Sequence, residues 1–237
     1  MGGRLNNMEK IMFKDPNKKY EIVRRAIPRQ LANFIYNYLI NHREVSEFLI
    51  KKGAVKDGSK GGFWGTWEDT QVPNTFCKYG DIALETLQMK LLPLMRKITG
   101  RNLVPCYAFA RIYKKGDELV RHIDRESCET SCTLHLGGDP WRIFIDPSGE
   151  SGIKKIIGPN KVVLKKNPPK GISLVMKPGD MLAYCGQVIE HWREPFKGNV
   201  HAQTFIHYND QDGPHGRSHV YDGRPMMGLP LLFSKDS

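Results

Sequence analysis

The stretch Tyr107–Asp124, YAFARIYKKGDELVRHID, decides the fold class of this chain. It begins as an apolar, strand-like run, is broken by a Lys-Gly-Asp turn, and ends on His122 and Asp124 with one residue between them. Side chains two residues apart project to the same side of an extended backbone. We therefore expect the imidazole of His122 and the carboxylate of Asp124 to bind one face of a metal ion.

A third metal ligand is expected from His191, in the segment GQVIEHWREPF. This histidine stands at the end of a second strand-like run, far along the chain from Asp124. Two histidines and one carboxylate form a facial triad, which suits non-haem Fe(II) and leaves other coordination positions open for substrates. His122, Asp124 and His191 are the predicted metal-binding and catalytic residues.

Composition favours a soluble protein with a proper core. Of the 237 residues, 40% are hydrophobic, which supports a domain of this size. No apolar run reaches the roughly 18 residues of a membrane span, and the N-terminus lacks the apolar core of a signal peptide. Five scattered cysteines, an odd number, fit free thiols in a reducing compartment better than a disulfide framework. We expect a cytoplasmic protein with no membrane partner.

The net charge of +11 is compatible with acidic partners such as nucleic acid or ribosomes. A solvated, lysine-rich surface explains the same charge without any partner. Lysines gather at 154–155 and 165–166 inside an expected loop insertion, and no nucleic-acid-binding motif accompanies them. The charge therefore leaves both interpretations open.

The pattern along the chain predicts helices first and strands afterwards. We expect a basic extension at 1–19, a single domain at 20–208 and an irregular tail at 209–237. Within the domain, residues 20–100 would supply helical support and residues 105–208 a β-helix core.

Two helices are predicted before the core. An edge strand at Tyr20–Ile27 should lead into a helix over Pro28–Leu49, where apolar residues recur with helical spacing. A second helix is expected at Asp81–Thr99, and Pro93 should kink or split it. Between them, Lys51–Thr75 is rich in glycine and aromatic residues, so no regular element is expected. It is either a mobile lid over an active site or a loop pinned to the core by its aromatic side chains.

The rest of the chain alternates short β-like runs with turn residues. Many short strands without intervening helices indicate a sandwich or jelly roll, so we predict a mainly β fold with N-terminal helices. The predicted strands are Cys106–Tyr113, Leu119–Ile123, Ser131–Leu136, Trp141–Asp146, Gly171–Met176, Asp180–Tyr184 and Ala202–Tyr208.

These motifs together resemble a known family. Tyr113 lies nine residues before His122, and the distal His191 belongs to the closing run PGDMLAYCGQVIEHWREPFKGNVHAQTFIHY. Over Tyr20–Tyr208 the chain resembles the Fe(II)- and 2-oxoglutarate-dependent dioxygenases, on the side of the prolyl 4-hydroxylases and their viral and marine bacterial members. The resemblance implies a double-stranded β-helix (a cupin-like jelly roll), with helices packed on one outer face and iron at its mouth.

The resemblance also implies a reaction. Fe(II), 2-oxoglutarate and O2 would be the cofactors, with ascorbate as an additional reductant, and succinate and CO2 would be released. The acceptor implied is a prolyl residue of a protein or peptide. Two alternatives stay open, namely oxidative modification of nucleic acid, and a non-catalytic jelly-roll module that only binds metal.

Tyr113 matches the family's tyrosine that donates to the far carboxylate of 2-oxoglutarate. The family usually places Arg or Lys nine or ten residues after the distal histidine, whereas this chain has Val200 and His201 there. Arg193 can supply a planar fork instead and is favoured over His201. Arg142 is a further source of positive charge.

Two more residues complete the predicted site. Thr133 lies on a predicted strand and is expected to line the 2-oxoglutarate pocket. Arg125 directly follows the ligand Asp124, so it should either hold that carboxylate, contact substrate, or form an ordinary surface ion pair.

Overall fold

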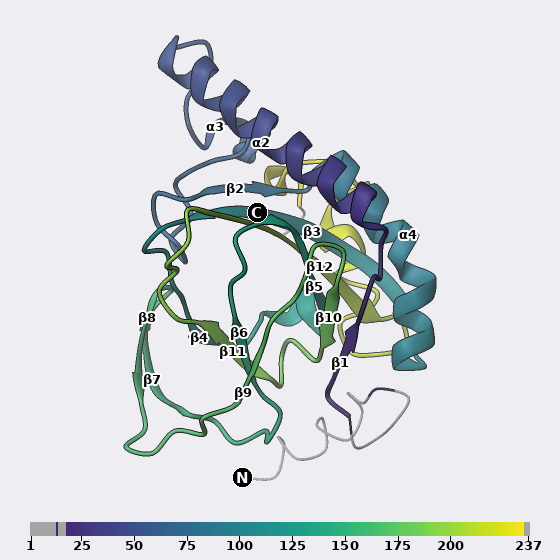
Figure 1. The fold of residues 1–237 in the computed structure, drawn as a ribbon. Coiled ribbons are helices and arrows are strands. Elements are labelled where there is room, and N and C mark those ends of the chain that lie inside the picture. Colours follow the sequence, from purple (N-terminus) through teal and green to yellow (C-terminus); the bar gives the residue numbers. More distant parts are fainter. Residues whose placement is uncertain (1–12, 14–17, 235–237) are drawn as a thin grey trace.

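Two antiparallel sheets face each other in the computed structural model, which describes Phe13 and residues 18–234 (Figure 1). The larger sheet contains, in spatial order, β1 (Tyr20–Val23), β10 (Met181–Tyr184), β5 (Thr130–Gly138), β12 (Val200–Asp210), β3 (Leu103–Lys114) and β2 (Phe76–Tyr79). The smaller sheet contains β4 (Leu119–His122), β11 (Glu190–Arg193), β6 (Ile143–Asp146) and β9 (Ile172–Leu174). A separate hairpin is formed by β7 (Ile153–Gly158) and β8 (Lys161–Leu164).

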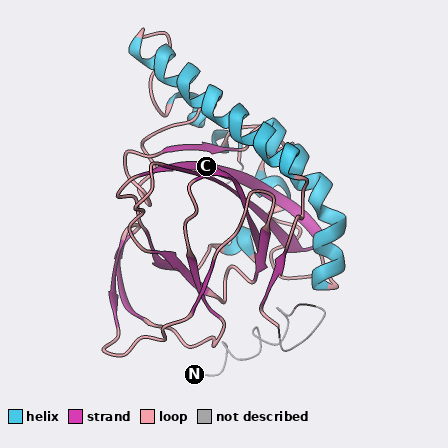
Figure 2. Cartoon of the chain, in the orientation of Figure 1, coloured by secondary structure: helices cyan, strands magenta, loops and turns pink. Residues whose placement is uncertain are grey.

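Helices cover one face of the larger sheet (Figure 2). They are α2 (Arg29–Lys51) and α4 (Ile82–Thr99), while α3 (Ser59–Gly62) is a single turn. Asp81 caps α4 because its carboxylate accepts from the backbone N–H groups of Ala83 and Leu84. Gly100 ends the helix in the left-handed conformation, with φ of 70°. Short 3-10 turns follow at η1 (Glu126–Cys128), η2 (Val220–Gly223) and η3 (Leu231–Phe233).

The main core lies between the helices and the larger sheet, and a smaller one lies between the two sheets. The predicted jelly-roll class with N-terminal helices is therefore confirmed. Leu39 of α2 and Leu84 and Met95 of α4 are fully buried in the main core. Leu182 and Tyr184 of β10 meet Ile145 of β6 in the core between the sheets. This second core closes one end of the space in which the candidate site lies.

All seven predicted strands are present, with shifted ends, and β2, β7 and β8 were missed. His191 was expected at the end of a strand-like run, whereas it lies near the start of β11 (Glu190–Arg193). The edge strand predicted at Tyr20–Ile27 ends at Val23, because the chain turns at Arg25, where φ is +54°. The insertion around the lysine pairs is a paired hairpin and not a loop.

Pro93 was expected to kink or split the second helix, and α4 is not split, since it runs from Ile82 to Thr99 through this residue. Proline removes the hydrogen bond to the carbonyl four residues earlier, which belongs to Met89. Pro93 and Met89 both lie on the exposed face of α4, where water can satisfy that carbonyl. The cost of the missing bond is therefore small at this position.

Two further expectations can be compared with the structure. None of the helices within residues 18–234 has the length and apolarity needed to cross a bilayer. All five cysteines are free and buried, as predicted from their number and spacing. The expected N-terminal extension at 1–19 falls almost wholly outside the described residues.

Candidate metal and 2-oxoglutarate site

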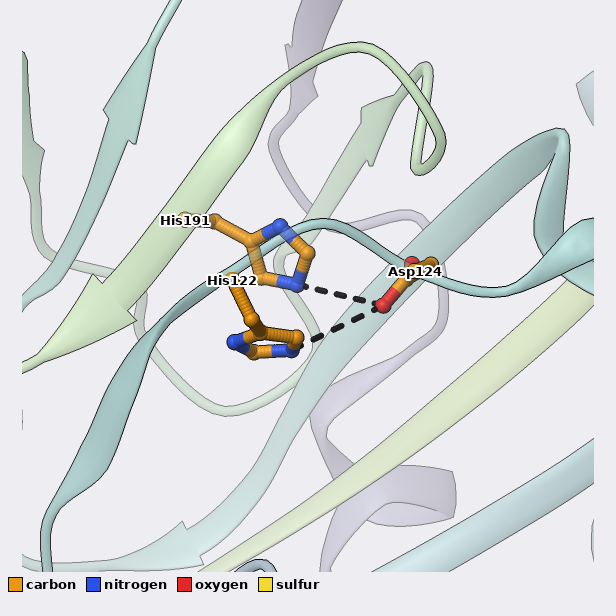
Figure 3. A group of neighbouring side chains, drawn as sticks. All are labelled: His122, Asp124 and His191. Atoms are coloured by element: carbon orange, nitrogen blue, oxygen red, sulfur yellow. Dashed lines mark ion pairs between the residues drawn. The ribbon is translucent and has the colours of Figure 1, made fainter. Parts of the chain in front are cut away.

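The three predicted metal ligands meet at one point (Figure 3). His122 ends β4, Asp124 follows it by two residues, and His191 lies directly opposite His122 on the neighbouring β11. Oδ1 of Asp124 lies 3.7 Å from Nε2 of His122 and 3.4 Å from Nε2 of His191. One ligand atom from each residue therefore faces a common centre, in an arrangement that suits a single metal ion.

Both histidines are oriented by their own backbone. Nδ1 of His122 lies 2.7 Å from the carbonyl of Val120, and Nδ1 of His191 lies 3.0 Å from the carbonyl of Ile189. A carbonyl can only accept, so each Nδ1 carries the proton and donates. In the neutral form of each ring, Nε2 then has a free lone pair directed at the centre, which is the tautomer that a metal requires, whereas protonated His191 donates from Nε2 to Asp124.

Asp124 is held with one oxygen free for a metal. Its Oδ2 accepts from the hydroxyl of Ser131 at 2.9 Å. That donation uses the only proton of Ser131, so Nδ1–H of His207, 2.9 Å away, donates to the serine oxygen. Gly186 is required beside them, because an added Cβ would lie 2.4 Å from Oδ2 of Asp124.

Burial and mutual charge set the protonation of the three ligands. Burial and, to a smaller extent, the neighbouring His191 lower the pKa of His122 to about 4, although Asp124 opposes the shift. Burial alone would raise the pKa of Asp124, but the charge and hydrogen bond of His191 hold it well below its ordinary value. His122 is thus neutral and Asp124 ionised near neutral pH, the forms in which both bind metal.

A buried ion cluster joins the strands that carry the histidines. Arg121, directly before His122, contacts Glu190 through Nε and Asp146 through Nη2, both at 2.5 Å. Trp192 covers the guanidinium, whose Cζ lies 4.1 Å from the ring centre. Hydrogen bonds from Ser151, Gly152 and Arg121 lower the pKa of Glu190, although burial raises it. These contacts fix β4, β11 and β6 side by side.

A cavity of about 780 Å³ opens over the triad. Its lining includes all three ligands, with an aromatic wall of Tyr79, Tyr107, Phe109 and Phe205. The 51–75 segment contributes Glu68 and Asp69, and the tail contributes Leu231. The triad is therefore accessible to a substrate of moderate size from one side.

Arg193 is fully buried, and among the described residues no carboxylate contacts it. Its Nη1 donates to the carbonyl of Trp141 at 2.8 Å, and Nη2 donates to Oε1 of Gln203 at 3.0 Å. Its Nε has no partner. Burial lowers the pKa of this guanidinium to about 10, which reflects a cation without a counter-ion.

Tyr113 and Arg111 also carry buried donors without partners. The hydroxyl of Tyr113 and the Nε of Arg111 have no partner of normal hydrogen-bond geometry among the described residues, although the two side chains interact with each other and Asp69 contacts Nη2 of Arg111 at 2.7 Å. Cζ of Arg111 lies 5.6 Å from the ring centre of Tyr113. Trp141 packs against both Tyr113 and Arg193. Unpaired donors of this kind are rare in protein interiors and indicate a site for an acceptor.

His201 offers no free nitrogen. Its two ring nitrogens lie 2.8 Å from the carbonyl of Asp139 and 2.7 Å from Oε1 of Gln203. Burial lowers its pKa well below the ordinary value, and the charge of Arg193 adds to the effect. Thr133 is buried behind the cavity, where it accepts from the amide of Gln203. Arg142 lies at the exposed edge beside Ser173.

Arg125 does not hold the carboxylate of Asp124. It pairs with the buried Asp222 of the tail at 2.8 and 2.5 Å, and its Cζ lies 4.6 Å from the ring centre of Tyr107. Asp222 also accepts from the hydroxyls of Tyr79 and Ser127. The tail therefore supports the cavity wall and does not merely wrap the surface.

Several residues of the site were missed by sequence reasoning. Ser131, His207 and Asp222 are too far from the ligands in sequence for local spacing to reveal them. Arg111 had a visible signal, since it lies two residues before Tyr113 on the same strand face. Asp69 of the 51–75 segment gave none, because only the folded loop brings it to Arg111.

Comparison with known proteins agrees with this geometry at the level of fold. No protein-family model matches the sequence, and no curated protein matches it either. Among solved structures, HygX from Streptomyces hygroscopicus, with nickel, 2-oxoglutarate and hygromycin B bound, matches with a TM-score of 0.57 and 11% identity. The match covers 83% of this chain and 84% of that one.

Two other solved structures also resemble this chain in fold. The non-haem α-ketoglutarate-dependent carbocyclase SnoK from nogalamycin biosynthesis matches with a TM-score of 0.55 and 12% identity, over 91% of this chain and 89% of that one. EctD from S. alaskensis, with 2-oxoglutarate and 5-hydroxyectoine, matches with a TM-score of 0.54 and 13% identity, over 82% and 73%. The chain thus has the fold of the 2-oxoglutarate-dependent non-haem iron oxygenases, as its sequence motifs predicted.

Proposed function

We propose that this protein is an Fe(II)- and 2-oxoglutarate-dependent oxygenase. The observation that supports it most strongly is the triad of His122, Asp124 and His191, whose free ligand atoms converge at an accessible point. A fully buried Arg193 without an acidic partner supports the cosubstrate, because such a cation is strongly stabilised by a bound carboxylate. The triad therefore fits the metal, and Arg193 fits an anion by its charge, although it is buried and is not among the residues that line the cavity.

Within this proposal each residue has a physical task. His122, Asp124 and His191 would hold the iron, and Ser131 keeps the second oxygen of Asp124 turned away from it. Arg193 would bind the far carboxylate of 2-oxoglutarate. When bound, the iron together with 2-oxoglutarate and O2 supplies the oxidising chemistry, with release of succinate and CO2.

Tyr113 would assist Arg193, since its unpaired hydroxyl can donate to the same carboxylate. We propose Arg193 in preference to His201, because both ring nitrogens of His201 already face oxygen atoms. Thr133 would act indirectly, by holding Gln203 against Arg193. Arg111 is partly neutralised by Asp69 and is therefore the weaker anchor.

The acceptor that we propose is a prolyl residue of a protein or peptide, with ascorbate as a reductant that maintains Fe(II). The resemblance in sequence supports this choice, and so does the aromatic wall of Tyr79, Tyr107 and Phe109, on which an apolar ring can pack. Five free thiols support a reducing, cytoplasmic location.

The first test is succinate formation from 2-oxoglutarate with Fe(II) and ascorbate. Turnover is expected for the wild-type protein and should be lost in His122→Ala, while His219→Ala in the tail should behave as wild type. A proline-rich peptide should raise turnover and gain one oxygen atom by mass spectrometry. A rise only with RNA would instead favour nucleic acid as the acceptor. If neither metal nor 2-oxoglutarate binds, the protein is not an oxygenase of this class.

A further inference from the structure

The hairpin of β7 and β8 stands apart from both larger sheets. It is inserted between β6 and β9 and lies on the side of the molecule away from α2 and α4 (Figure 1). Its base is fixed by the buried cluster, where the backbone of Gly152 donates to Glu190 at 2.9 Å and Arg121 donates to the carbonyl of Pro169 at 2.6 Å. A rigid base thus presents an exposed two-stranded element.

The register of the hairpin divides its side chains between two faces. Ile153 lies opposite Leu164, and Ile156 lies opposite Val162. Directly opposed residues project to the same side, and neighbours along a strand project to opposite sides. Val162 and Leu164 therefore lie on one face of the hairpin together with their partners Ile156 and Ile153. All four side chains are aliphatic. Ile156 is 67% exposed and Leu164 is 42% exposed, so much of this face is uncovered.

Lysines lie on the other face of the hairpin, where Lys155 is opposite Val163 and Lys161 is opposite Gly158, and at its base, so their long side chains can stay at headgroup level while the aliphatic face enters a bilayer. Six of them lie within residues 151–170, all exposed, and this segment contains no Asp or Glu. None of the six lies in an ion pair with another described residue. The same segment contains no arginine and no aromatic residue. The lysines are at positions 154, 155, 161, 165, 166 and 170.

We propose that the β7–β8 hairpin is a docking site for an anionic lipid surface. Lysines are attracted to acidic headgroups, while an exposed aliphatic face enters the boundary between headgroups and acyl chains. Nucleic acid fits less well, because it offers no apolar surface to the isoleucines and the segment has no aromatic residue or arginine on which bases could stack. A folded protein partner also fits less well, since a hairpin of this length is smaller than half of a standard interface.

This inference departs from the expectation that the protein has no membrane partner. That expectation rested on the absence of a spanning segment, which says nothing about attachment to a membrane surface. The hairpin lies outside the lining of the cavity over the triad, so the inference stands independently of the proposed reaction.

Sedimentation with phospholipid vesicles tests the proposal. The full chain should bind vesicles that contain phosphatidylserine, should not bind vesicles of phosphatidylcholine alone, and should be released by salt. Replacing Lys155 and Lys161 with Gln should weaken binding by roughly tenfold or more, since each lysine near an acidic surface contributes about a factor of five. Ile156→Ser with Leu164→Ser should weaken it as well, although the charge is unchanged.

Lys90→Gln with Lys97→Gln is the matched control, because it removes the same charge from the exposed side of α4. This control should bind like the wild-type protein, and circular dichroism should be the same for all variants. Absence of binding to acidic vesicles would overturn the proposal, and so would equal losses in the α4 control and the hairpin variants. Binding to a single-stranded RNA oligonucleotide, unaffected by Ile156→Ser with Leu164→Ser, would identify a nucleic-acid surface instead.

Discussion

Two buried arginines lie on the smaller sheet beside the metal ligands, and they differ in the charges around them. Arg121 is 5% exposed and contacts the carboxylates of both Asp146 and Glu190. Arg193 is fully buried and contacts only uncharged oxygens of Trp141 and Gln203 in the described structure. The first has its counter-ions within the fold, whereas the second has none.

The difference separates a structural charge from a ligand-binding charge. A buried ion that is fully paired holds strands in place, and removing one partner leaves the others buried and unpaired. A buried ion without a partner costs stability by itself and is retained where a ligand supplies the missing charge. Replacement by methionine should therefore lower the free energy of unfolding at Arg121, but leave it unchanged or raise it at Arg193.

The largest effect is expected for Arg121→Met. Methionine keeps much of the side-chain volume but leaves Asp146 and Glu190 buried without their cation. The free energy of unfolding should fall by about 3–5 kcal/mol, as measured by urea denaturation. Arg193→Met is the matched control and should leave the stability of the unliganded protein unchanged or higher. If both variants lose a similar amount of unfolding free energy, the two arginines do not differ in the way proposed.

The next largest effect concerns ligand affinity and belongs to Arg193→Met. Loss of a charge-assisted contact of about 2–3 kcal/mol should weaken 2-oxoglutarate binding by roughly 30- to 150-fold. Arg193→Lys should recover part of the affinity, because a point charge replaces the planar fork. Thermal stabilisation by added 2-oxoglutarate provides the measurement. Equal stabilisation of wild type and Arg193→Met would show that the anchor lies elsewhere, with Arg111 as the first alternative.

A third arginine, Arg125, provides an intermediate case, because it is half-exposed while its partner Asp222 is 5% exposed. Burial raises the pKa of Asp222, but the hydrogen bonds and charge of Arg125 lower it to about 2. A lowered carboxyl pKa stabilises the fold at pH above about 4, and this stabilisation is lost as the pH falls towards 2. Asp222→Asn should therefore remove about 2 kcal/mol at neutral pH and flatten stability between pH 4 and 2.

The pH dependence of unfolding in urea measures this contribution. Asp212→Asn is a suitable control, because Asp212 is an exposed carboxylate of the same tail. If the acid-dependent loss of stability is the same in Asp222→Asn as in wild type, Asp222 does not provide it.

The smallest effect is expected for Tyr113→Phe, which removes one uncharged donor and leaves the ring against Trp141 in place. Affinity for 2-oxoglutarate should fall by roughly fivefold, which corresponds to about 1 kcal/mol. The stability of the unliganded protein should not fall, because the hydroxyl has no partner there. A loss of stability without a loss of affinity would make Tyr113 a purely structural residue.

The sequence predicted what depends on local spacing. His122 and Asp124 share one side of an extended segment, and the jelly-roll class follows from many short strands. Arg193 was considered because it lies two residues after His191 in the sequence, and both residues lie on β11. These features need only the alternation of a strand and the identity of the residues.

Other features depend on contacts between distant segments and had no local signal. Glu190 and Asp146 meet Arg121 only because β11 lies next to both β4 and β6. The tail was predicted to be irregular, which does not reveal that Asp222 returns to the cavity wall. Pro93 was expected to kink or split a helix, but a split depends on whether water reaches the freed carbonyl. Strand pairing and solvent exposure decide such cases.

The measurement that tests the central claim most directly is calorimetry of 2-oxoglutarate binding to the Fe(II)-loaded protein under anaerobic conditions. We predict binding to the wild-type protein, none in His122→Ala at the same concentrations, and at least roughly tenfold weaker binding in a folded Arg193→Met variant. Failure of the wild-type protein to bind 2-oxoglutarate would contradict the proposed function. Binding that is equally tight in Arg193→Met would contradict the account of the two arginines.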